Sequence, residues 1–203
     1  MNLPNKLTIA RMCAIPVVIV VSLLSFLKTV SNVINVQLLI LLVVFALASF
    51  TDFLDGKIAR KYNLVTNFGK FMDPLADKLL VMATMIAMLE LGIFKAFDIS
   101  FGFVITIILA REFAITGLRT LAADNGVVIA ASKLGKSKTV TQMAMIIYVL
   151  AINMIDINNN MGIAKDIITL VLVSLATIMT IVSGIDYFVK NAKVLKETNN
   201  KEN

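Results

Sequence analysis

The sequence predicts an all-α, polytopic membrane protein with six transmembrane helices and both termini in the cytoplasm. Hydrophobic residues make up 59% of its 203 residues and charged residues only 16%, far from the balance of a soluble domain of this length. Uncharged runs cover residues 29–51, 139–155 and 167–185, and about 20 such residues cross a hydrocarbon layer roughly 30 Å thick. We expect one six-helix domain over residues 1–190 and a polar tail over residues 191–203.

The first span follows Lys6 and Arg11 and covers the apolar run 12–27. No small-x-small cleavage site stands out near Ser25, so we interpret it as an uncleaved helix and not as a signal peptide. Pro16 is tolerable there because neighbouring helices satisfy the carbonyl group that it frees.

The second span runs from about Gln37 to Tyr62, and the third from near Gly69 to Leu91. Pro74 costs little in the first turns of the third helix, because early amides have no helical partner. Only residues 79–89 of that helix are unbroken by charge. Its N-terminal part is therefore expected to face a wet or metal-filled cavity.

Polar segments separate the last three spans, and the fourth span itself contains charged residues. Arg111, Glu112 and Arg119 lie inside the fourth span and need a polar pocket. Tyr62 and Tyr187 fall where an interfacial aromatic belt is expected. The fourth to sixth spans are expected at 101–123, 139–155 and 164–189, with turns at 28–36, 63–67 and 156–162, a connection at 92–100 and a loop or half-helix at 124–138.

Residues 52–77 form a polar block between apolar runs and read DFLDGKIARKYNLVTNFGKFMDPLAD. Asp52 and Asp55 are three residues apart, and Asp73 and Asp77 are four apart, so each pair shares one face of a helix. Pairing with nearby lysines accounts for one or two of these acids. Four carboxylates at a bilayer edge repel one another unless cations hold them, and hard oxygen ligands select Mg²⁺, Mn²⁺ or Ca²⁺. The block therefore predicts a metal site.

The block contains the pattern D-x2-D-G-x2-A-R-x8-G-x3-D-x3-D, which resembles the signature of the CDP-alcohol phosphotransferases at every position. The residues that match it are Asp52, Asp55, Gly56, Ala59, Arg60, Gly69, Asp73 and Asp77. The resemblance implies an integral membrane enzyme that moves a phosphatidyl group from CDP-diacylglycerol, or a phospho-base from a CDP-alcohol, onto a hydroxyl. Family members are commonly homodimers, so a homodimer is expected.

The resemblance also implies roles for the four acids. Two ions, Mg²⁺ or Mn²⁺, bridged by carboxylates can clamp a pyrophosphate and stabilise the charge on the leaving oxygen. Asp52, Asp55 and Asp73 are the expected ligands. In the family the fourth acid has two tasks, so Asp77 is expected to bind the second metal ion and, as the catalytic base, to take the proton from the acceptor hydroxyl. The chain has no histidine, which rules out a histidine base.

The residues expected to bind CDP-diacylglycerol come from this motif and from the N-terminus. By resemblance, Gly56 and Ala59 frame the cytidine pocket, although a glycine also serves close helix packing. Arg60 suits phosphate oxygens. An N-x2-T-x2-R segment resembles the opening of the family's prokaryotic phosphatidylglycerophosphate synthases, with an N-cap and a membrane-surface arginine as the alternative. The expected set is Asn5, Thr8, Arg11, Gly56, Ala59, Arg60 and Gly69.

A second group of charged residues is expected to select the acceptor. Arg111 and Arg119 are eight residues apart on one helix, about two turns and so on one face. Several cations around one cavity favour a phosphorylated alcohol over a neutral one, because unpaired buried cations are costly. Glu112 either orients an arginine or forms an internal ion pair, and we favour the ion pair. The segment KLGKSKT at residues 133–139 is expected to fold over these arginines with Lys133, Lys136, Lys138 and Thr139. An ordinary basic loop is the alternative for the lysines, most of all for Lys133.

The patterns A-R-E-x6-R and G-K-x-K-T resemble the phosphatidylglycerophosphate synthase branch of the family, whose acceptor is sn-glycerol 3-phosphate. The residues expected to bind this acceptor are Arg111, Arg119, Lys136, Lys138 and Thr139. A cardiolipin synthase and a phosphatidylinositol-phosphate synthase of the same family stay open, because their acceptors are also phosphorylated. Outside the family, an ion-coupled transporter is disfavoured because no repeated halves are visible, and a scaffold has no need of four acids.

The distribution of basic residues predicts the orientation of the spans. All 19 lysines and arginines except Lys28, Lys95 and Lys165 fall on one side of the six spans, and such an excess marks the cytoplasmic side. We expect a plasma-membrane protein whose active site faces the cytoplasm. The net charge of +6 lies beside the spans, which favours membrane lipids and phosphorylated substrates over nucleic acid as partners.

Overall fold

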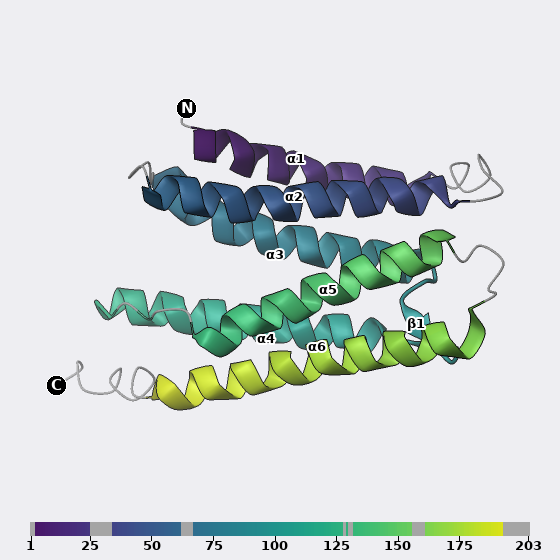
Figure 1. Cartoon of the computed structure of the whole chain (residues 1–203). Helices are drawn as coiled ribbons and strands as arrows, with labels where there is room; N and C mark the ends of the chain where they lie inside the picture. Colours follow the sequence, from purple (N-terminus) through teal and green to yellow (C-terminus); the bar gives the residue numbers. More distant parts are fainter. Residues whose placement is uncertain are drawn as a thin grey trace. The chain divides into compact units, whose positions relative to one another are not determined.

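The computed structural model describes residues 3–24, 34–61, 67–127, 129, 132–155 and 161–192. The helices in these residues are α1 (Leu3–Leu23), α2 (Val36–Lys61), α3 (Asn67–Glu90), α4 (Gly102–Asp124), α5 (Lys133–Ile155) and α6 (Gly162–Lys190) (Figure 1). A short hairpin, β1 (Lys95–Ala96) and β2 (Ile99–Ser100), lies between α3 and α4. The described residues confirm the prediction of an all-α protein, with six helices among them.

Helices α2, α3, α4 and α6 begin and end within two residues of the predicted spans. The first and fifth helices begin earlier than predicted, α1 at Leu3 and α5 at Lys133. The half-helix expected before the fifth span is its first part. Ser132 caps α5, because its Oγ accepts a hydrogen bond from the Gly135 amide at 3.0 Å. The first parts of α1 and α5 are polar, which disfavours their insertion into the bilayer but does not prevent them from being helical.

The turns predicted at 28–36, 63–67 and 156–162, together with Tyr62 and the tail at 191–203, lie wholly or largely outside the described residues. The connection predicted at 92–100 is described and contains the hairpin, which the sequence analysis missed. Its strands are only two residues long, too short for a period-two pattern to be seen.

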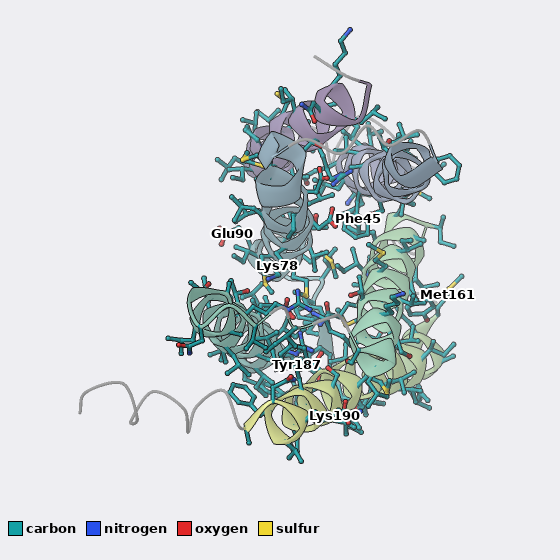
Figure 2. All side chains as sticks on the ribbon, turned by 90° about the vertical axis from the view of Figure 1, so that its left-hand side faces the viewer. Phe45, Lys78, Glu90, Met161, Tyr187 and Lys190 are labelled. Atoms are coloured by element: carbon teal, nitrogen blue, oxygen red, sulfur yellow. The ribbon has the colours of Figure 1, made fainter. Side chains whose placement is uncertain are left out.

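Three described helices are long and apolar enough to cross a membrane: residues 5–23, 134–155 and 162–190. A shorter apolar helical stretch covers residues 36–51. Figure 2 shows many side chains projecting outward from the helices. The exposed large apolar residues include Leu47 on α2 and Ile178 on α6. Apolar side chains on outward helix faces are typical of contact with lipid, so the fold is that of a membrane protein.

The chain divides into two compact units, one of residues 1–102 and 146–169 and the other of residues 103–145 and 170–203. In the first unit, α1 packs against both α2 and α3. Leu38, Leu41 and Phe45 are buried, and their spacing of three and four residues gives α2 one apolar face. The single domain predicted over residues 1–190 stays a prediction.

In the second unit, a small apolar cluster lies between α4 and α6. Ile115, Leu118 and Ala122 of α4 and Tyr187 of α6 are all buried within it. The three α4 residues recur at intervals of three and four and so share one helix face. This face brings the α6 aromatic ring against the helix that carries the predicted acceptor arginines.

The hairpin turns sharply after α3. Gly92 has a φ of 68° and ends α3 in a left-handed cap, in which the Ile93 amide donates to the Met88 carbonyl at 3.1 Å. Phe97 and Asp98 also have positive φ, 49° and 60°, as a two-residue type I′ turn requires. The Phe97 amide donates to Asp166 Oδ2 of α6 at 3.1 Å, which ties the hairpin to the start of that helix.

Replacing the turn by Phe97→Asn with Asp98→Gly is expected to stabilise the protein by roughly 1 kcal/mol, because a bulky residue at positive φ is strained. The midpoint of thermal unfolding in detergent should rise by about 2–4 °C for a chain of this length. Ile99→Thr, in the adjacent strand, serves as the control and should give no rise. A lower midpoint in the double variant would show that the Phe97 ring holds the hairpin.

Candidate active site

Two of the predicted acids, Asp73 and Asp77 on α3, face α1. Thr8 Oγ1 donates a short hydrogen bond to Asp73 Oδ1, and Arg11 Nη1 donates to Asp77 Oδ1 at 2.7 Å. The order of the contacts shows that α1 and α3 run parallel. Because both acids contact α1, they share one face of α3, as their spacing predicts.

The α1 side of this contact is buried. Thr8 is 1% exposed and Arg11 2% exposed, whereas the side chain of Asp77 is 36% exposed. A buried guanidinium needs a nearby carboxylate, because little water solvates it. Asn5 lies one turn before Thr8 on the same helix and is half-buried. The N-terminal residues predicted to bind CDP-diacylglycerol thus include two that contact the acids of α3.

The remaining motif residues lie on α2 and at the start of α3. Asp52, Asp55, Gly56, Ala59 and Arg60 all belong to the last ten residues of α2, and their side chains lie outside the described part of the structure. Gly69 is buried in the first turn of α3. The described residues contain no group of three histidine, cysteine or acidic side chains that could hold a metal ion. The four-acid metal site therefore stays a prediction.

The described pair of acids nevertheless fits a hard divalent cation. Asp73 and Asp77 present carboxylate oxygens from one helix face, and the Thr8 hydroxyl lies against the first of them. Mg²⁺ and Mn²⁺ prefer such oxygen donors. Arg11 already neutralises one of the two negative charges, so a metal ion here needs further acids, which α2 supplies in the prediction.

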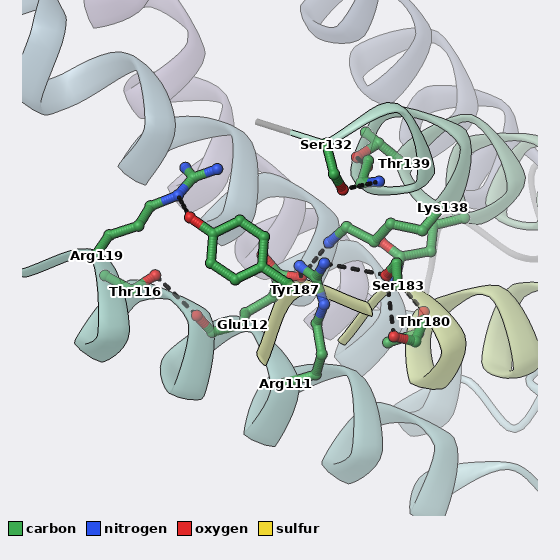
Figure 3. Close-up of polar contacts among 12 residues, drawn as sticks. Arg111, Glu112, Thr116, Arg119, Ser132, Lys138, Thr139, Thr180, Ser183 and Tyr187 are labelled. Atoms are coloured by element: carbon green, nitrogen blue, oxygen red, sulfur yellow. Dashed lines mark hydrogen bonds and ion pairs between the residues drawn. The ribbon is translucent and has the colours of Figure 1, made fainter. Parts of the chain in front are cut away.

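Two of the predicted acceptor residues, Arg111 and Lys138, meet at Glu112 in the second unit (Figure 3). Arg111 Nη1 donates to Glu112 Oε1 at 2.9 Å, and Lys138 Nζ of α5 donates a short hydrogen bond to the same oxygen. All three side chains are about nine-tenths buried. The internal ion pair predicted for Glu112 is present, and it is shared by two cations, so the group has a net charge of +1.

Helix α6 contributes residues that the sequence analysis did not assign to the site. Arg111 Nη2 donates to Ser183 Oγ at 3.0 Å, and a Cβ added to Gly184 would lie 3.1 Å from Arg111 Cγ. Arg119 Nε donates to the Tyr187 hydroxyl at 2.8 Å. Tyr187 is 2% exposed, so its prediction as an interfacial belt residue is wrong.

A signal for these residues exists in the sequence. Thr180, Ser183 and Tyr187 recur at intervals of three and four along an otherwise apolar helix, which places polar atoms along one face of it. All three are buried. Thr180 accepts a hydrogen bond from Gln142 of α5 at 2.9 Å. A polar stripe on an apolar helix therefore indicates contacts with polar groups of neighbouring helices.

The other predicted acceptor residues lie in the first turns of α5. Lys136 is exposed, and the Thr139 hydroxyl donates to the Gly135 carbonyl of its own helix at 3.2 Å. The structure thus joins Arg111 and Lys138 through Glu112 and places Arg119 separately, against Tyr187. The acids belong to the first compact unit and these cations to the second.

A family model described as CDP-alcohol phosphatidyltransferase matches residues 1–182. The chain is 40% identical to the CDP-diacylglycerol–glycerol-3-phosphate 3-phosphatidyltransferase of Bacillus subtilis (strain 168), over 98% of this chain and 99% of that protein. A protein of the same description from Rickettsia bellii (strain RML369-C) is 43% identical over 92% of this chain and 93% of its own length. A cardiolipin synthase (CMP-forming) from Oryza sativa subsp. japonica is 33% identical over 74% of this chain and 46% of its own.

Arg11→Met is expected to lower the stability of the protein by roughly 1–2 kcal/mol, because it removes the ion pair between α1 and Asp77; the partial exposure of Asp77 limits the loss. The midpoint of thermal unfolding in detergent should fall by about 3–6 °C. Lys6→Met removes an exposed cation from the same helix and should leave the midpoint unchanged. Equal midpoints for the two variants would contradict a stabilising role for the Arg11–Asp77 pair.

Proposed function

Because the chain belongs to the CDP-alcohol phosphatidyltransferase family, we propose that it transfers the phosphatidyl group of CDP-diacylglycerol to sn-glycerol 3-phosphate. The products are phosphatidylglycerophosphate and CMP. The observation that carries this proposal is the similarity, over nearly the whole of both chains, to the Bacillus subtilis protein described by this reaction. The complete acidic motif and the group of cations on α4 support it.

The residues of α3 perform the transfer in this proposal. Asp77 accepts the proton of the acceptor hydroxyl while the hydroxyl oxygen forms a bond to the phosphatidyl phosphorus. The bond from that phosphorus to the CMP oxygen breaks, and CMP leaves. Arg11 holds Asp77 in place through its 2.7 Å ion pair, and Thr8 holds Asp73. Both carboxylates thus have defined directions before the substrate arrives, which reduces the reorganisation needed for reaction.

We assign a metal site to Asp52, Asp55, Asp73 and Asp77, with Mg²⁺ or Mn²⁺ and two ions in all. When bound, these ions neutralise the diphosphate of the lipid and the charge that develops on the leaving CMP. The oxygen-only donor set of the described acids supports this assignment. The motif residues Gly56, Ala59, Arg60 and Gly69 and the N-terminal Asn5, Thr8 and Arg11 complete the proposed site for CDP-diacylglycerol.

The cations of the second unit support a phosphorylated acceptor. Glu112 cancels one of the charges of Arg111 and Lys138, so the pair and its acid leave one positive charge. Arg119 and the exposed Lys136 add two more. A dianionic phosphate offsets two of these three positive charges, whereas a neutral alcohol offsets none. Thr139, one turn from Lys136 on α5, completes the proposed acceptor set.

The position in the membrane is part of the proposal. Six spans with cytoplasmic termini place all basic residues except Lys28, Lys95 and Lys165 on the inner side of the plasma membrane. Lys95 lies in the hairpin that follows the C-terminal end of α3, whereas Asp73 and Asp77 lie near its N-terminal end. Lys165 lies in the first turn of α6, whereas Ser183 and Tyr187 lie near the end of that helix. We propose that the protein is a homodimer, on the family resemblance.

The test of the reaction is CMP release by purified protein in detergent with Mg²⁺, CDP-diacylglycerol and a panel of alcohols. Glycerol 3-phosphate should support CMP release, and glycerol, serine and inositol should not. Removal of divalent ions with a chelator should abolish release, and added Mg²⁺ or Mn²⁺ should restore it. Preference for phosphatidylglycerol would instead identify a cardiolipin synthase, and preference for inositol phosphate would identify a phosphatidylinositol-phosphate synthase.

Asp77→Asn is expected to reduce CMP release to less than a tenth of the wild-type rate, because the amide cannot accept the acceptor proton. Binding of CDP-diacylglycerol, measured as the rise in unfolding temperature that it causes, should be largely retained. Asp98→Asn, an exposed acid in the hairpin, is the matched control and should keep wild-type turnover. Activity above a tenth in the Asp77 variant would remove this residue from the role of base.

A further inference from the structure

Arg119 and Tyr187 form a contact that combines a hydrogen bond with an approach of the guanidinium to an aromatic ring. Arg119 Nε donates to the Tyr187 hydroxyl at 2.8 Å, and the guanidinium carbon lies 5.4 Å from the centroid of the ring. Figure 3 shows the guanidinium turned away from α4 with its Nε directed at the hydroxyl. The hydrogen bond fixes the position of the guanidinium, whose carbon also lies within the range of a cation–π interaction with the ring.

The two partners differ in exposure. Tyr187 is 2% exposed and packs in the apolar cluster with Ile115, Leu118 and Ala122 of α4. Arg119, which contacts the hydroxyl end of the tyrosine, is exposed. A ring held by packing on several sides has little rotamer freedom. The buried tyrosine is therefore a rigid support for an exposed cation.

The bonding of the two arginines explains why this support matters. Arg111 uses both terminal nitrogens within the protein, on Glu112 and Ser183. In Arg119 it is Nε that is occupied, and among the described residues neither of its terminal nitrogens has a hydrogen-bond partner. These two nitrogens form the fork that binds phosphate oxygens in pairs. Of the two α4 arginines, Arg119 is therefore the one whose terminal nitrogens are available to bind an anion from outside the protein.

We propose that Tyr187 is a positioning residue for the acceptor. Its hydroxyl holds Arg119 Nε, so that the terminal nitrogens present a fixed fork to the phosphate of glycerol 3-phosphate. The inference rests on the proposed function, since it needs a phosphorylated acceptor. It assigns to α6 a role in acceptor affinity, although no residue of α6 belongs to the motifs that predict the site.

The test compares Tyr187→Phe, Arg119→Ala and the double variant by steady-state kinetics in detergent. Arg119→Ala should raise the KM for glycerol 3-phosphate at least tenfold. Tyr187→Phe keeps the ring and its packing and should raise this KM about three- to tenfold, with kcat and the KM for CDP-diacylglycerol within twofold of wild type. Because Tyr187 acts through Arg119, adding Tyr187→Phe to Arg119→Ala should change the KM no further.

Tyr148→Phe, on α5, is the matched control and should leave all three constants unchanged. An unchanged KM in Tyr187→Phe beside a raised KM in Arg119→Ala would overturn the positioning role and leave the proposed function standing. The positioning role would be overturned if the effects of the two substitutions on KM multiplied in the double variant. It would also be overturned, in favour of a packing role, if Tyr187→Phe lowered kcat/KM equally for both substrates and lowered the unfolding temperature. Wild-type protein that releases no CMP with glycerol 3-phosphate would refute the proposed function itself.

Discussion

A buried cation among apolar helices needs a carboxylate within hydrogen-bond distance, because neither lipid chains nor apolar side chains can solvate its charge. The polar interior of this protein follows from that constraint. Arg11 pairs with Asp77 between α1 and α3, and Arg111 and Lys138 share Glu112 between α4 and α5. The Arg11–Asp77 pair links α1 to α3, and the Lys138–Glu112 pair links α5 to α4, so the charges assigned to the proposed chemistry also hold these helices in register.

The supporting helices are as important to the site as the helices that bear the motifs. The acids lie on α2 and α3 and the arginines on α4, but α1 holds the acids of α3 and α6 holds the arginines. Gly184 shows how closely α6 approaches, because a methyl group at this position would lie 3.1 Å from the Arg111 stem. A glycine here leaves room for the Arg111 side chain to pack against the α6 backbone, and Ser183 beside it accepts the Arg111 hydrogen bond.

The two groups of charge have opposite signs and correspond to the two halves of the proposed reaction. The acids suit metal ions and the diphosphate of an activated lipid, and the cations suit the phosphate of the acceptor. Within the cationic group the burial is graded. Arg111, Glu112 and Lys138 are about nine-tenths buried, whereas Arg119 and Lys136 are exposed. The buried members set the local charge, and the exposed members are available to a substrate.

The order and limits of the helices were largely determined by the sequence, because apolar runs and the polar residues that end them are local features. The shared face of Asp73 and Asp77 was also determined, since helical periodicity decides which residues of one helix lie together. The start of α5 was missed because hydropathy measures the preference for lipid, and a polar segment capped by Ser132 is helical without that preference.

Only the tertiary structure decided which faces of different helices meet. Periodicity does not state which side of α1 packs on α3, so the partner of Arg11 could not be read from spacing. Tyr187 has the composition of an interfacial residue, yet packing against α4 buries its ring and directs its hydroxyl to Arg119. The sequence determined which side chains lie on each face of a helix. The packing of the helices determined which of these side chains pair, because packing depends on the shapes of both helix surfaces together.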